Sequence, residues 1–418
     1  MAQLSDDCFA DGGRLMTLAA ALDLLARRLV PVVGVERRPI AQCLGRILAE
    51  EVLSPLDVPA VANSAVDGYA VRFDDLECQR ETRLPVVGRA TAGHPEERAF
   101  GPGEAVRVFT GAVLPGGADT VMMQEDCVAE DGFVTIRPGI RKGANRREAG
   151  EDVAAGAVAL KAGARLRPQD IGLAAAVGRG ELMVRSPLTV ALFSTGDELV
   201  EPGRPPEFGK IYDSNRYTLA ALLTELGAAV TDLGILPDRR EVVSAALAEA
   251  ARGHDLVLTS GGVSVGEEDH VRGVVEALGS LHFWRLAIKP GRPIAVGQLG
   301  RTPFVGLPGN PVAAMVTFLR FVRPMALTLM GAGDIAPIFY RVRAGFEHRK
   351  KRDRREWVRA RLVADPSGEP VAAKFPRDGA GILSSLVESD GLVELPEDLT
   401  RVEPGMIVDF LPFSEVSR

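Results

Sequence analysis

The chain has 418 residues, more than a single hydrophobic core normally serves, so the sequence predicts about two to four domains. Hydrophobic residues make up 46% and charged residues 25% of the chain, as in ordinary globular proteins, and a formal net charge of −7 excludes a general attraction to nucleic acid. The four cysteines form no CxxC pair and the five histidines form no HxxxH pair, which disfavours a zinc site and indicates reduced thiols in a cytoplasm.

The first 52 residues read as a helical entry segment. Residues 14–28 and 38–50 carry apolar residues at three-and-four spacing, which predicts two amphipathic helices, and Pro39 suits the first turn of the second one. The N-terminus lacks the basic region and apolar core of a secretion signal. No run of about 18 apolar residues occurs elsewhere, so we expect no membrane association.

Residues 53–147 change to short alternating or apolar runs separated by Gly, Pro and Asp, which is the pattern of a β-rich domain. Residues 148–187 then give a glycine-punctuated strand pair followed by a short helix. We therefore expect 1–52 and 148–187 to form one discontinuous helical and linker domain, with the β-rich domain inserted between its halves.

Residues 188–333 alternate between predicted strands and predicted helices. The strands are expected at 188–193, 230–236, 255–260 and 304–307, and the helices at 214–226, 240–252, 269–278 and 311–328. This order predicts an α/β domain whose parallel sheet is covered by helices. After residue 333 β-like runs return, so residues 334–418 are expected to form a C-terminal β-barrel domain.

The apolar strand at 255–260 runs into a glycine- and serine-rich loop that ends in carboxylates. Glycines in such a loop let backbone N–H groups converge on a phosphate-like ligand, and a carboxylate at its end can hold a divalent cation. The residues concerned are Gly261, Gly262 and Gly266, followed by Glu267, Glu268 and Asp269. The combination indicates chemistry on a metal-bound phosphate ester.

Further carboxylates follow the other predicted strands. In an open α/β sheet, ligands bind outside the carboxyl ends of the strands, so the loops at 194–198, 236–238, 260–269 and 307–311 are expected at one rim. Glu198, Asp238 and Asp269 would then form a carboxylate cluster suited to Mg²⁺. Each of them also suits a helix N-cap, Asp269 above all, and the two roles are compatible.

Two basic groups precede the last strand of this domain. Arg285 and Lys289 lie in the segment 283–297, from which they can reach the same rim and neutralise phosphate or molybdate-like oxyanions. A lysine before Pro-Gly is also a common solvated turn residue. The basic run at 348–356 lies between predicted strands, and we expect a hairpin tip or a solvated face there rather than a nucleic-acid site.

The β-rich segment offers weaker signals. Asp67 and Thr110 each precede a glycine, which favours a turn in both places, although Thr110 could present a hydroxyl to a ligand. Residues 145–152 include Arg147 and Asp152 among mixed charges, and locally they read as a surface loop of self-compensating charge.

A series of motifs runs in one order along nearly the whole chain: NSAVDGYAVR, FTGAVLPGGADTVMMQED, REAGEDVAAG, STGDEL, YDSNRYTLAALLTELG, TSGGVSVGEEDH, RLAIKPGRP and GLPGNPVAAMVTF. Together they resemble the MoeA family of molybdopterin molybdenumtransferases, which includes the E domain of gephyrin and the plant Cnx protein. No single motif suffices for this resemblance, but the series does.

The resemblance implies the last step of molybdenum cofactor synthesis, in which molybdopterin adenylate and molybdate give the cofactor and AMP with the aid of Mg²⁺. It also implies an elongated homodimer of four-domain subunits, in which the β-rich domain of the opposite subunit closes a shared active-site cleft. In this mechanism carboxylates and Mg²⁺ hold the phosphoanhydride-like link, while Arg and Lys groups bring molybdate next to the dithiolene sulfurs.

Site residues are carried over by motif, as the resemblance implies them. Those on the pterin and phosphate side are Thr195, Gly196, Ser260, Gly261, Gly262, Ser264, Gly266 and Lys289, with Pro308 and Pro311 shaping the cleft. Those on the metal side are Asp197, Glu198, Asp238 and Asp269. Asp67, Thr110, Arg147 and Asp152 match the dimer-spanning cleft, which overrides the turn interpretation of the first two, and Arg285 matches a basic position.

Two departures and two alternatives accompany the resemblance. Ala60–Ala62 replace the aromatic or acidic pair of relatives, and Arg292 stands where Lys is frequent, which alters hydrogen-bond geometry. The TSGGVS loop also suits a molybdopterin adenylyltransferase, and gephyrin itself suggests a non-catalytic scaffold. The retained acidic residues favour an active enzyme. Its expected partners are a molybdopterin adenylyltransferase and molybdoenzyme maturation proteins, with neither nucleic acid nor membrane.

Overall fold

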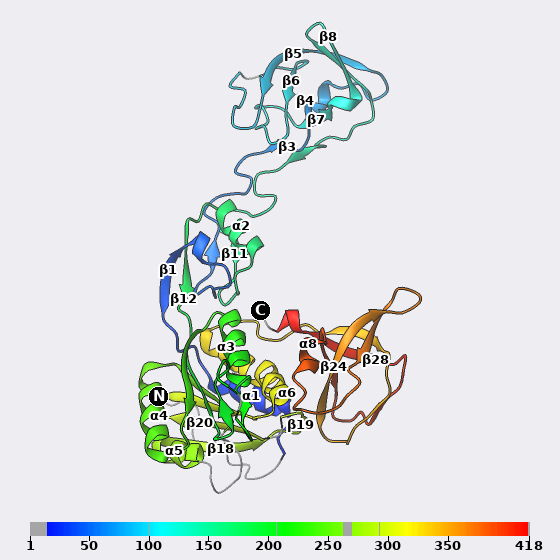
Figure 1. Cartoon of the computed structure of the whole chain (residues 1–418). Coiled ribbons are helices and arrows are strands. Elements are labelled where there is room, and N and C mark those ends of the chain that lie inside the picture. The colour runs from blue at the N-terminus through cyan, green and yellow to red at the C-terminus, as the bar shows by residue number, and fades with distance from the viewer. Residues whose placement is uncertain (1–14, 99, 206, 262–269, 292, 417–418) are drawn as a thin grey trace.

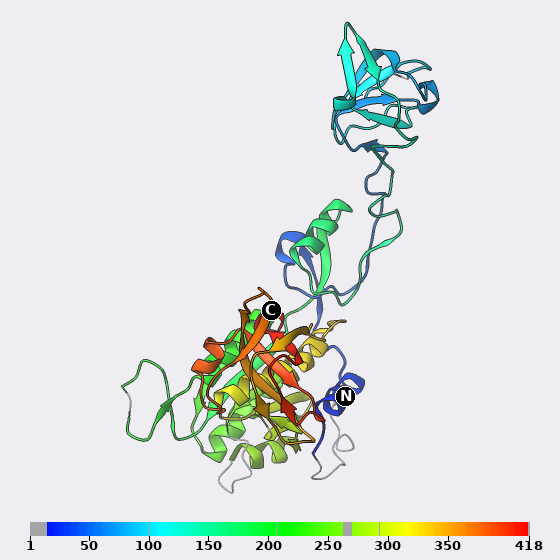
Figure 2. The same cartoon turned by 90° about the vertical axis from the view of Figure 1, so that its right-hand side faces the viewer.

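The structure is a computed structural model that describes residues 15–98, 100–205, 207–261, 270–291 and 293–416, with backbone alone at 282–285 and 293. The molecule is elongated: a β-rich unit lies at one end, a narrow arm follows, and an α/β unit and a barrel lie side by side at the other end (Figures 1 and 2). The expected class, an α/β multidomain chain with a β-rich domain, a discontinuous domain and a C-terminal barrel, is confirmed.

The β-rich unit is a six-stranded sheet in the order β7-β4-β6-β5-β9-β8. Its strands are β4 (Gly68–Val71), β5 (Thr82–Ala90), β6 (Ala105–Val108), β7 (Thr120–Met123), β8 (Cys127–Glu130) and β9 (Phe133–Ile136). Gly68 does not form a turn, as its Asp-Gly context suggested, but begins β4. A Cβ there would lie 1.8 Å from the carbonyl oxygen of Met122, so only glycine lets β4 approach β7 this closely.

The arm is built from two segments that are distant in the sequence. β1 (Val35–Pro39) pairs with β12 (Glu181–Arg185), and β2 (Val52–Leu53) pairs with β11 (Val158–Leu160), beside the helix α2 (Pro168–Ala176). The helix predicted at 38–50 is wrong, because only the short 3-10 turn Ile40–Gln42 forms there. Gly45 adopts a φ of 75°, which a helix cannot continue through, and Leu48 instead bridges to β12.

The α/β unit contains a six-stranded sheet in the order β16-β13-β17-β21-β20-β18. Its strands are β13 (Thr189–Thr195), β16 (Ala229–Leu236), β17 (Leu256–Ser260), β18 (Gly279–Arg285), β20 (Pro293–Leu299) and β21 (Thr302–Leu307). The first four in the order run parallel to one another, as predicted, whereas β20 pairs antiparallel with both β21 and β18. The sheet is therefore mixed, since the glycine turn at Gly300 reverses the chain directly between β20 and β21.

Helices cover both faces of this sheet. They are α1 (Leu18–Arg28), α3 (Asn215–Leu226), α4 (Arg240–Gly253), α5 (His270–Leu278), α6 (Pro311–Thr317) and α7 (Arg323–Met330), with the π-helical segment Phe318–Val322 between the last two. α4 and α5 pack on one face, while α1, α3, α6 and α7 share the larger core on the other. The N-terminal helix α1 thus belongs to the core of the α/β unit, although it was expected in the discontinuous domain.

The stretch Pro311–Met330 is long and apolar enough to cross a membrane by length and composition alone. It is 83% buried within the described structure, however, and it lies in the larger core with the β-strands. It is accordingly the central core helix of the α/β unit, and burial of its whole circumference explains its apolar composition.

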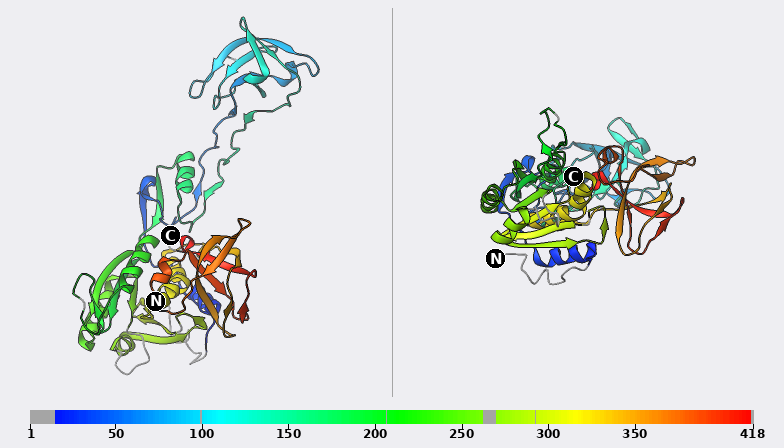
Figure 3. Two further views of the ribbon diagram at one scale, coloured as in Figure 1. Left: turned by 45° about the vertical axis from the view of Figure 1, so that its right-hand side comes forward. Right: turned by 60° about the horizontal axis from the view of Figure 1, so that its bottom comes forward.

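The C-terminal unit is a closed barrel, seen beside the α/β unit in Figure 3. Its strands are β22 (Tyr340–Ala344), β24 (Arg355–Ala364), β25 (Pro370–Lys374), β26 (Gly391–Leu395) and β28 (Ile407–Pro412). β24 pairs with both β25 and β26, which closes the ring. The two-residue strand β19 (Ile288–Lys289) leaves the α/β unit and adds to β24 in parallel, so that it joins the two units edge to edge.

Candidate functional site

Two adjoining cavities lie at the carboxyl ends of β17 and β21. The larger, of ≈ 630 Å³, lies between the α/β unit and the barrel, and the smaller, of ≈ 330 Å³, lies between the sheet and the N-terminus of α3. Both are lined by Gly261, Gly309 and Asn310, so a ligand that spans them passes one shared wall. This is the rim at which an open α/β sheet is expected to bind ligands.

The smaller cavity collects several predicted residues, namely Thr195, Glu198, Ser260, Gly261 and Pro311. Sequence reasoning missed Asn215, whose buried side chain organises this wall. Its Nδ2 donates to Oγ of Ser260 at 2.8 Å and to the carbonyl oxygen of Gly309 at 2.7 Å, and thereby ties α3 to the ends of β17 and β21. The YDSNRYT motif carried this signal, because an Asn that opens a helix beside the rim can cap it or hold a loop.

The carboxylate of Glu198 folds back over Gly196. A Cβ at Gly196, where φ is 145°, would lie 2.6 Å from an oxygen of that carboxylate, so the glycine makes room for it. Glu198 is exposed towards the cavity, whereas the neighbouring hydroxyl Oγ1 of Thr195 is buried and has no partner among the described residues. A free carboxylate and an unsatisfied hydroxyl at one wall suit a polar ligand.

The other predicted metal ligands are dispersed. Asp197 is exposed, and its carbonyl accepts from Nζ of Lys210, while Asp238 is half-buried after β16 and lines neither cavity. Among the described residues, no three His, Cys, Asp or Glu side chains are grouped closely enough to hold a metal ion. Gly262, Ser264, Gly266 and Asp269 lie outside the described residues, as does Arg292, and Arg285 is described by its backbone only.

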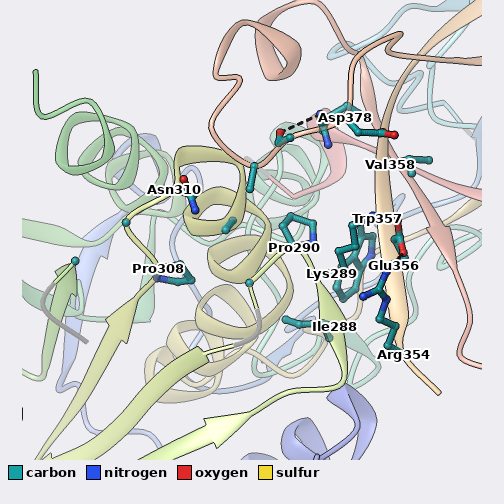
Figure 4. A pocket seen from close by; sticks show the side chains of 17 residues that line it. Ile288, Lys289, Pro290, Pro308, Asn310, Arg354, Glu356, Trp357, Val358 and Asp378 are labelled. Carbon is teal, nitrogen blue, oxygen red and sulfur yellow. Dashed lines mark hydrogen bonds and ion pairs between the residues drawn. The ribbon is translucent and has the colours of Figure 1, made fainter. Parts of the chain in front are cut away.

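The larger cavity is lined by the predicted residues Lys289 and Pro308 and by barrel residues that sequence reasoning did not assign (Figure 4). Its barrel wall contributes Arg354, Glu356, Arg359 and Asp378. The register of β19 on β24 sets Lys289 opposite Glu356, and Nζ of Lys289 lies 2.6 Å from Oε1 of Glu356. A segment between two strands of the α/β unit thus shares an ion pair with the barrel.

Glu356 is the most buried charged group of this cavity, with an exposure of 1%. Burial alone would raise its pKa, but hydrogen bonds from His348 and Lys289 and their charges outweigh burial and lower the pKa to about 2. Nη2 of Arg354 lies 3.0 Å from its other oxygen. The carboxylate is therefore ionised and fixed by several donors.

The basic run at 348–356, expected to be a hairpin tip or a solvated face, is only partly exposed: Arg349 and residues 351–353, which include a turn, face solvent. His348, Lys350 and Glu356 are buried, and Nζ of Lys350 donates to the carbonyl oxygens of Pro396 and Leu399 at 2.7 Å. The prediction is wrong for these three residues, because they face the barrel interior and the cavity wall, which a local charge count cannot distinguish from solvent. Arg359 is also buried, and its Nε donates to Oγ of Ser385 at 3.0 Å.

The remaining predicted residues lie in or next to the β-rich unit. Oδ1 of Asp67 accepts from the backbone N and from Oγ1 of Thr110, both at 2.8 Å, and these bonds lower the pKa of Asp67. Arg147 lies in a two-residue strand opposite Asn63, and the backbone N of Asp152 donates to Val58. The β-rich unit, which carries Asp67 and Thr110, lies at the far end of this chain from both cavities (Figures 1 and 2).

Comparisons with known proteins cover nearly the whole length of the chain. Residues 16–178 match the family described as MoeA N-terminal region (domain I and II), residues 191–328 match the probable molybdopterin binding domain, and residues 341–413 match the MoeA C-terminal region (domain IV). Molybdopterin molybdenumtransferase of Haemophilus influenzae is 38% identical over 96% of this chain and 100% of that protein. The Nostoc enzyme of the same name is 37% identical over 86% of this chain and 85% of its own.

Solved structures agree with these sequence matches. A molybdopterin biosynthesis MoeA protein from Pyrococcus horikoshii superposes with a TM-score of 0.81 at 29% identity, covering 96% of this chain and 100% of that one. A second structure of a MoeA protein from this organism gives a TM-score of 0.75 at 32% identity, covering 96% and 99%. The similarity thus includes every unit of the fold.

Proposed function

The chain belongs to the molybdopterin molybdenumtransferase (MoeA) family and is a transferase that inserts molybdenum in molybdenum cofactor biosynthesis; from this membership and its paired cavities we propose that it converts molybdopterin adenylate and molybdate into cofactor and AMP. The observation that carries this proposal is the shared wall of Gly261, Gly309 and Asn310, which puts two cavities with charged or hydroxyl groups in their linings side by side. In this proposal each cavity binds a different substrate.

The larger cavity is assigned to molybdate. Among the described residues, three cationic side chains line it, those of Lys289, Arg354 and Arg359, against the two carboxylates of Glu356 and Asp378. The balance is positive, and a guanidinium or ammonium fixed in a partly enclosed cavity is a strong partner for an oxyanion. Molybdate held here lies next to the shared wall, beyond which the dithiolene sulfurs of the second substrate are brought.

The smaller cavity is assigned to the pyrophosphate link of molybdopterin adenylate. Oγ1 of Thr195 lacks a protein partner among the described residues, and Oγ of Ser260 accepts a hydrogen bond from Asn215. Both hydroxyl groups can therefore donate their hydrogen to a phosphate oxygen. Mg²⁺ usually takes only one or two protein carboxylates together with phosphates and waters, and Glu198 fits that need. The ion would supply charge neutralisation at the phosphates.

In the proposed reaction the phosphoanhydride bond between the pterin phosphate and AMP breaks, and an oxygen from water or molybdate completes the phosphate of AMP. Asn215 keeps Ser260 and the Gly309 turn in place, and Glu198 holds the phosphate side against the rim. Lys289 and Arg359 orient molybdate on the other side of the shared wall. Positioning and electrostatic complementarity are the sources of rate enhancement in this arrangement.

A second copy of the chain completes the site in this proposal. Asp67 and Thr110 lie on the β-rich unit, which the arm holds away from the cavities of its own chain (Figure 2). A two-fold symmetric dimer can bring that unit to the cavities of the partner, and it contributes both surfaces twice. In this proposal the enzyme works in the cytoplasm and takes its substrate from an adenylyltransferase. Its acidic overall charge argues against a general attraction to nucleic acid.

The test of the reaction mixes purified protein with molybdopterin adenylate, Mg²⁺ and molybdate. We expect AMP release and activation of an apo-molybdoenzyme, both of them only when molybdate is present. ATP-dependent adenylation of molybdopterin would instead support an adenylyltransferase. A protein that binds ligands yet catalyses neither step would support a scaffold.

The test of the shared cleft is complementation between two inactive variants. Glu198→Gln removes a cavity residue and Asp67→Asn a residue of the β-rich unit, and neither change touches a buried core. If subunits exchange after equal mixing, half of the dimers are mixed and each has one intact site, so about one quarter of full activity returns. Absence of any recovery, with subunit exchange verified by differently tagged chains, would show that each chain works alone.

A further inference from the structure

Lys289 and Glu356 form an ion pair whose two members differ sharply in exposure. The Lys289 side chain is 45% exposed in the larger cavity, while the Glu356 side chain is 2% exposed. Their 2.6 Å contact holds the ammonium against the cavity wall. Figure 4 labels both residues at this wall. Lysine has a flexible four-carbon stem, so this is a mobile cation held by an immobile carboxylate.

Glu356 itself cannot move to follow the lysine. Nε2 of His348 lies 2.9 Å from Oε1, the same oxygen that receives Lys289, and Nη2 of Arg354 lies 3.0 Å from Oε2. The side chains of these two partners are 6% and 16% exposed, so Lys289 is the partner with most access to the cavity. When Lys289 leaves, the other two donors continue to satisfy the carboxylate.

We infer that Glu356 is a positioning residue that holds Lys289 in the empty cavity and yields it to the incoming oxyanion. This inference rests on the proposed assignment of the larger cavity to molybdate. Binding then exchanges one ionic contact of Lys289 for another, instead of adding a new one. Glu356 thereby weakens oxyanion binding and speeds release, which matters for a substrate that must leave its site to be inserted.

The residue also sets the charge of the cavity. Glu356 and Asp378 are the two carboxylates among the described lining residues, and Nζ of Lys374 already lies 2.9 Å from Asp378. Replacing Glu356 by glutamine keeps the volume and a carbonyl acceptor but removes the charge that competes with the oxyanion. The release of Lys289 from its carboxylate partner and the loss of a negative charge from the cavity both favour tighter oxyanion binding.

The experiment is a calorimetric titration of the full-length protein with molybdate, and separately with sulfate, in the absence of pterin. We expect Glu356→Gln to bind both anions about five- to tenfold more tightly than the unchanged chain. In the turnover assay the KM for molybdate should fall by a similar factor while kcat does not rise. A purely structural role for Glu356 would weaken binding instead.

A double-mutant cycle separates action through Lys289 from a general change of charge. Lys289→Met should weaken oxyanion binding, and Glu356→Gln should tighten it less than twofold in that background. An equal gain with and without Lys289 would overturn the inference. Glu356→Asp draws the carboxylate back from Lys289 and should give a smaller gain in affinity, which serves as the test if the glutamine variant does not fold.

The matched control is Glu397→Gln. Glu397 is a half-buried barrel carboxylate that pairs with Arg355 at 3.0 Å but does not line the cavity, so its loss should leave the molybdate affinity unchanged. Failure of the unchanged chain to bind either anion would refute the assignment of the larger cavity, and with it this inference. Binding by the unchanged chain without a gain in Glu356→Gln would refute this inference alone.

Discussion

Replacing Asn215 by aspartate should damage both cavities at once, because its amide holds the wall next to both of them. Asn215 is 9% exposed, and its Nδ2 donates at 2.8 Å to Ser260 and at 2.7 Å to the carbonyl of Gly309. Aspartate at the same place offers no hydrogen. The hydroxyl of Ser260 can rotate and donate to it, but the carbonyl of Gly309 would face a second oxygen.

The magnitude follows from these contacts. A lost neutral hydrogen bond costs about 1 kcal/mol, and a buried carbonyl left unsatisfied beside a new charge adds roughly 1–3 kcal/mol. We therefore expect Asn215→Asp to lower the free energy of unfolding by roughly 3 kcal/mol. In a unit of this size the corresponding fall of the melting temperature is roughly 6–12 °C. AMP release should fall at least about tenfold, since misplaced binding loops lose their orientation.

Thermal unfolding and AMP release test this prediction together, and acid supplies an internal check. A protonated aspartate regains an O–H donor, so part of the lost stability should return as the pH is lowered towards 4. Asn145→Asp is the matched control, because Nδ2 of Asn145 donates at 3.0 Å to the carbonyl of Val121 inside the β-rich unit. It should reduce stability but leave molybdate affinity unchanged. Unaltered melting and AMP release in Asn215→Asp would refute the reasoning.

Three further predictions follow from other contacts. Glu198→Gln should lower AMP release by about a hundredfold and raise the Mg²⁺ concentration that the reaction requires. The melting temperature should not change, because the Glu198 carboxylate has no ion-pair or hydrogen-bond partner among the described residues. Normal Mg²⁺ dependence would exclude Glu198 from the metal side. Arg216→Met should cost about 3–5 kcal/mol of unfolding free energy, since it leaves the 2%-exposed side chain of Asp213 without its 3.0 Å partner; a melting temperature within a degree of the unchanged chain would contradict this. The pKa of Glu356 in the folded protein, about 2, lies below its ordinary value of 4.5, so its ionisation stabilises the fold by roughly 3 kcal/mol above about pH 5, and this contribution is lost as the pH falls through about 2. The difference in melting temperature between the unchanged chain and Glu356→Gln should therefore shrink between pH 6 and 3. A constant difference would contradict the lowered pKa.

The sequence predicted best those elements whose signal is local and continuous. The strands β13, β17 and β21 each contain a short apolar run and are buried along nearly their whole length, and α3 and α4 have their boundaries within a residue or two of the predicted ones. The segment 38–50 shows where local spacing fails. Its apolar residues are spaced like those of a helix, yet its backbone pairs with strands more than a hundred residues away, and no local pattern reports such a partner.

The same distinction explains which site residues could be found. Glycine and carboxylate loops after strands are visible in one dimension, and Glu198 was located that way. Lys289 was found from its basic segment, and Thr195 and Ser260 through the family motifs. Arg354, Glu356 and Arg359 were not, because their importance arises from β24 meeting β19, a pairing that brings together residues 67 positions apart. The carboxylate cluster predicted from neighbouring loops also depends on distances between loops, which sequence order does not set.

The edge pairing of β19 with β24 gives the C-terminal barrel a direct part in the site. Without the barrel, Lys289 would lose Glu356, and the larger cavity would lose the guanidinium groups of Arg354 and Arg359. A free α/β unit would also lose the part of the smaller cavity's wall that Gly381 and Leu383 form. In the proposed function, the hydroxyls of Thr195 and Ser260 face the phosphates and the barrel adds an enclosed oxyanion site beside them. Joining molybdate to an adenylated pterin requires such a second site, so the barrel's share in the larger cavity supports the proposed insertion reaction over adenylation.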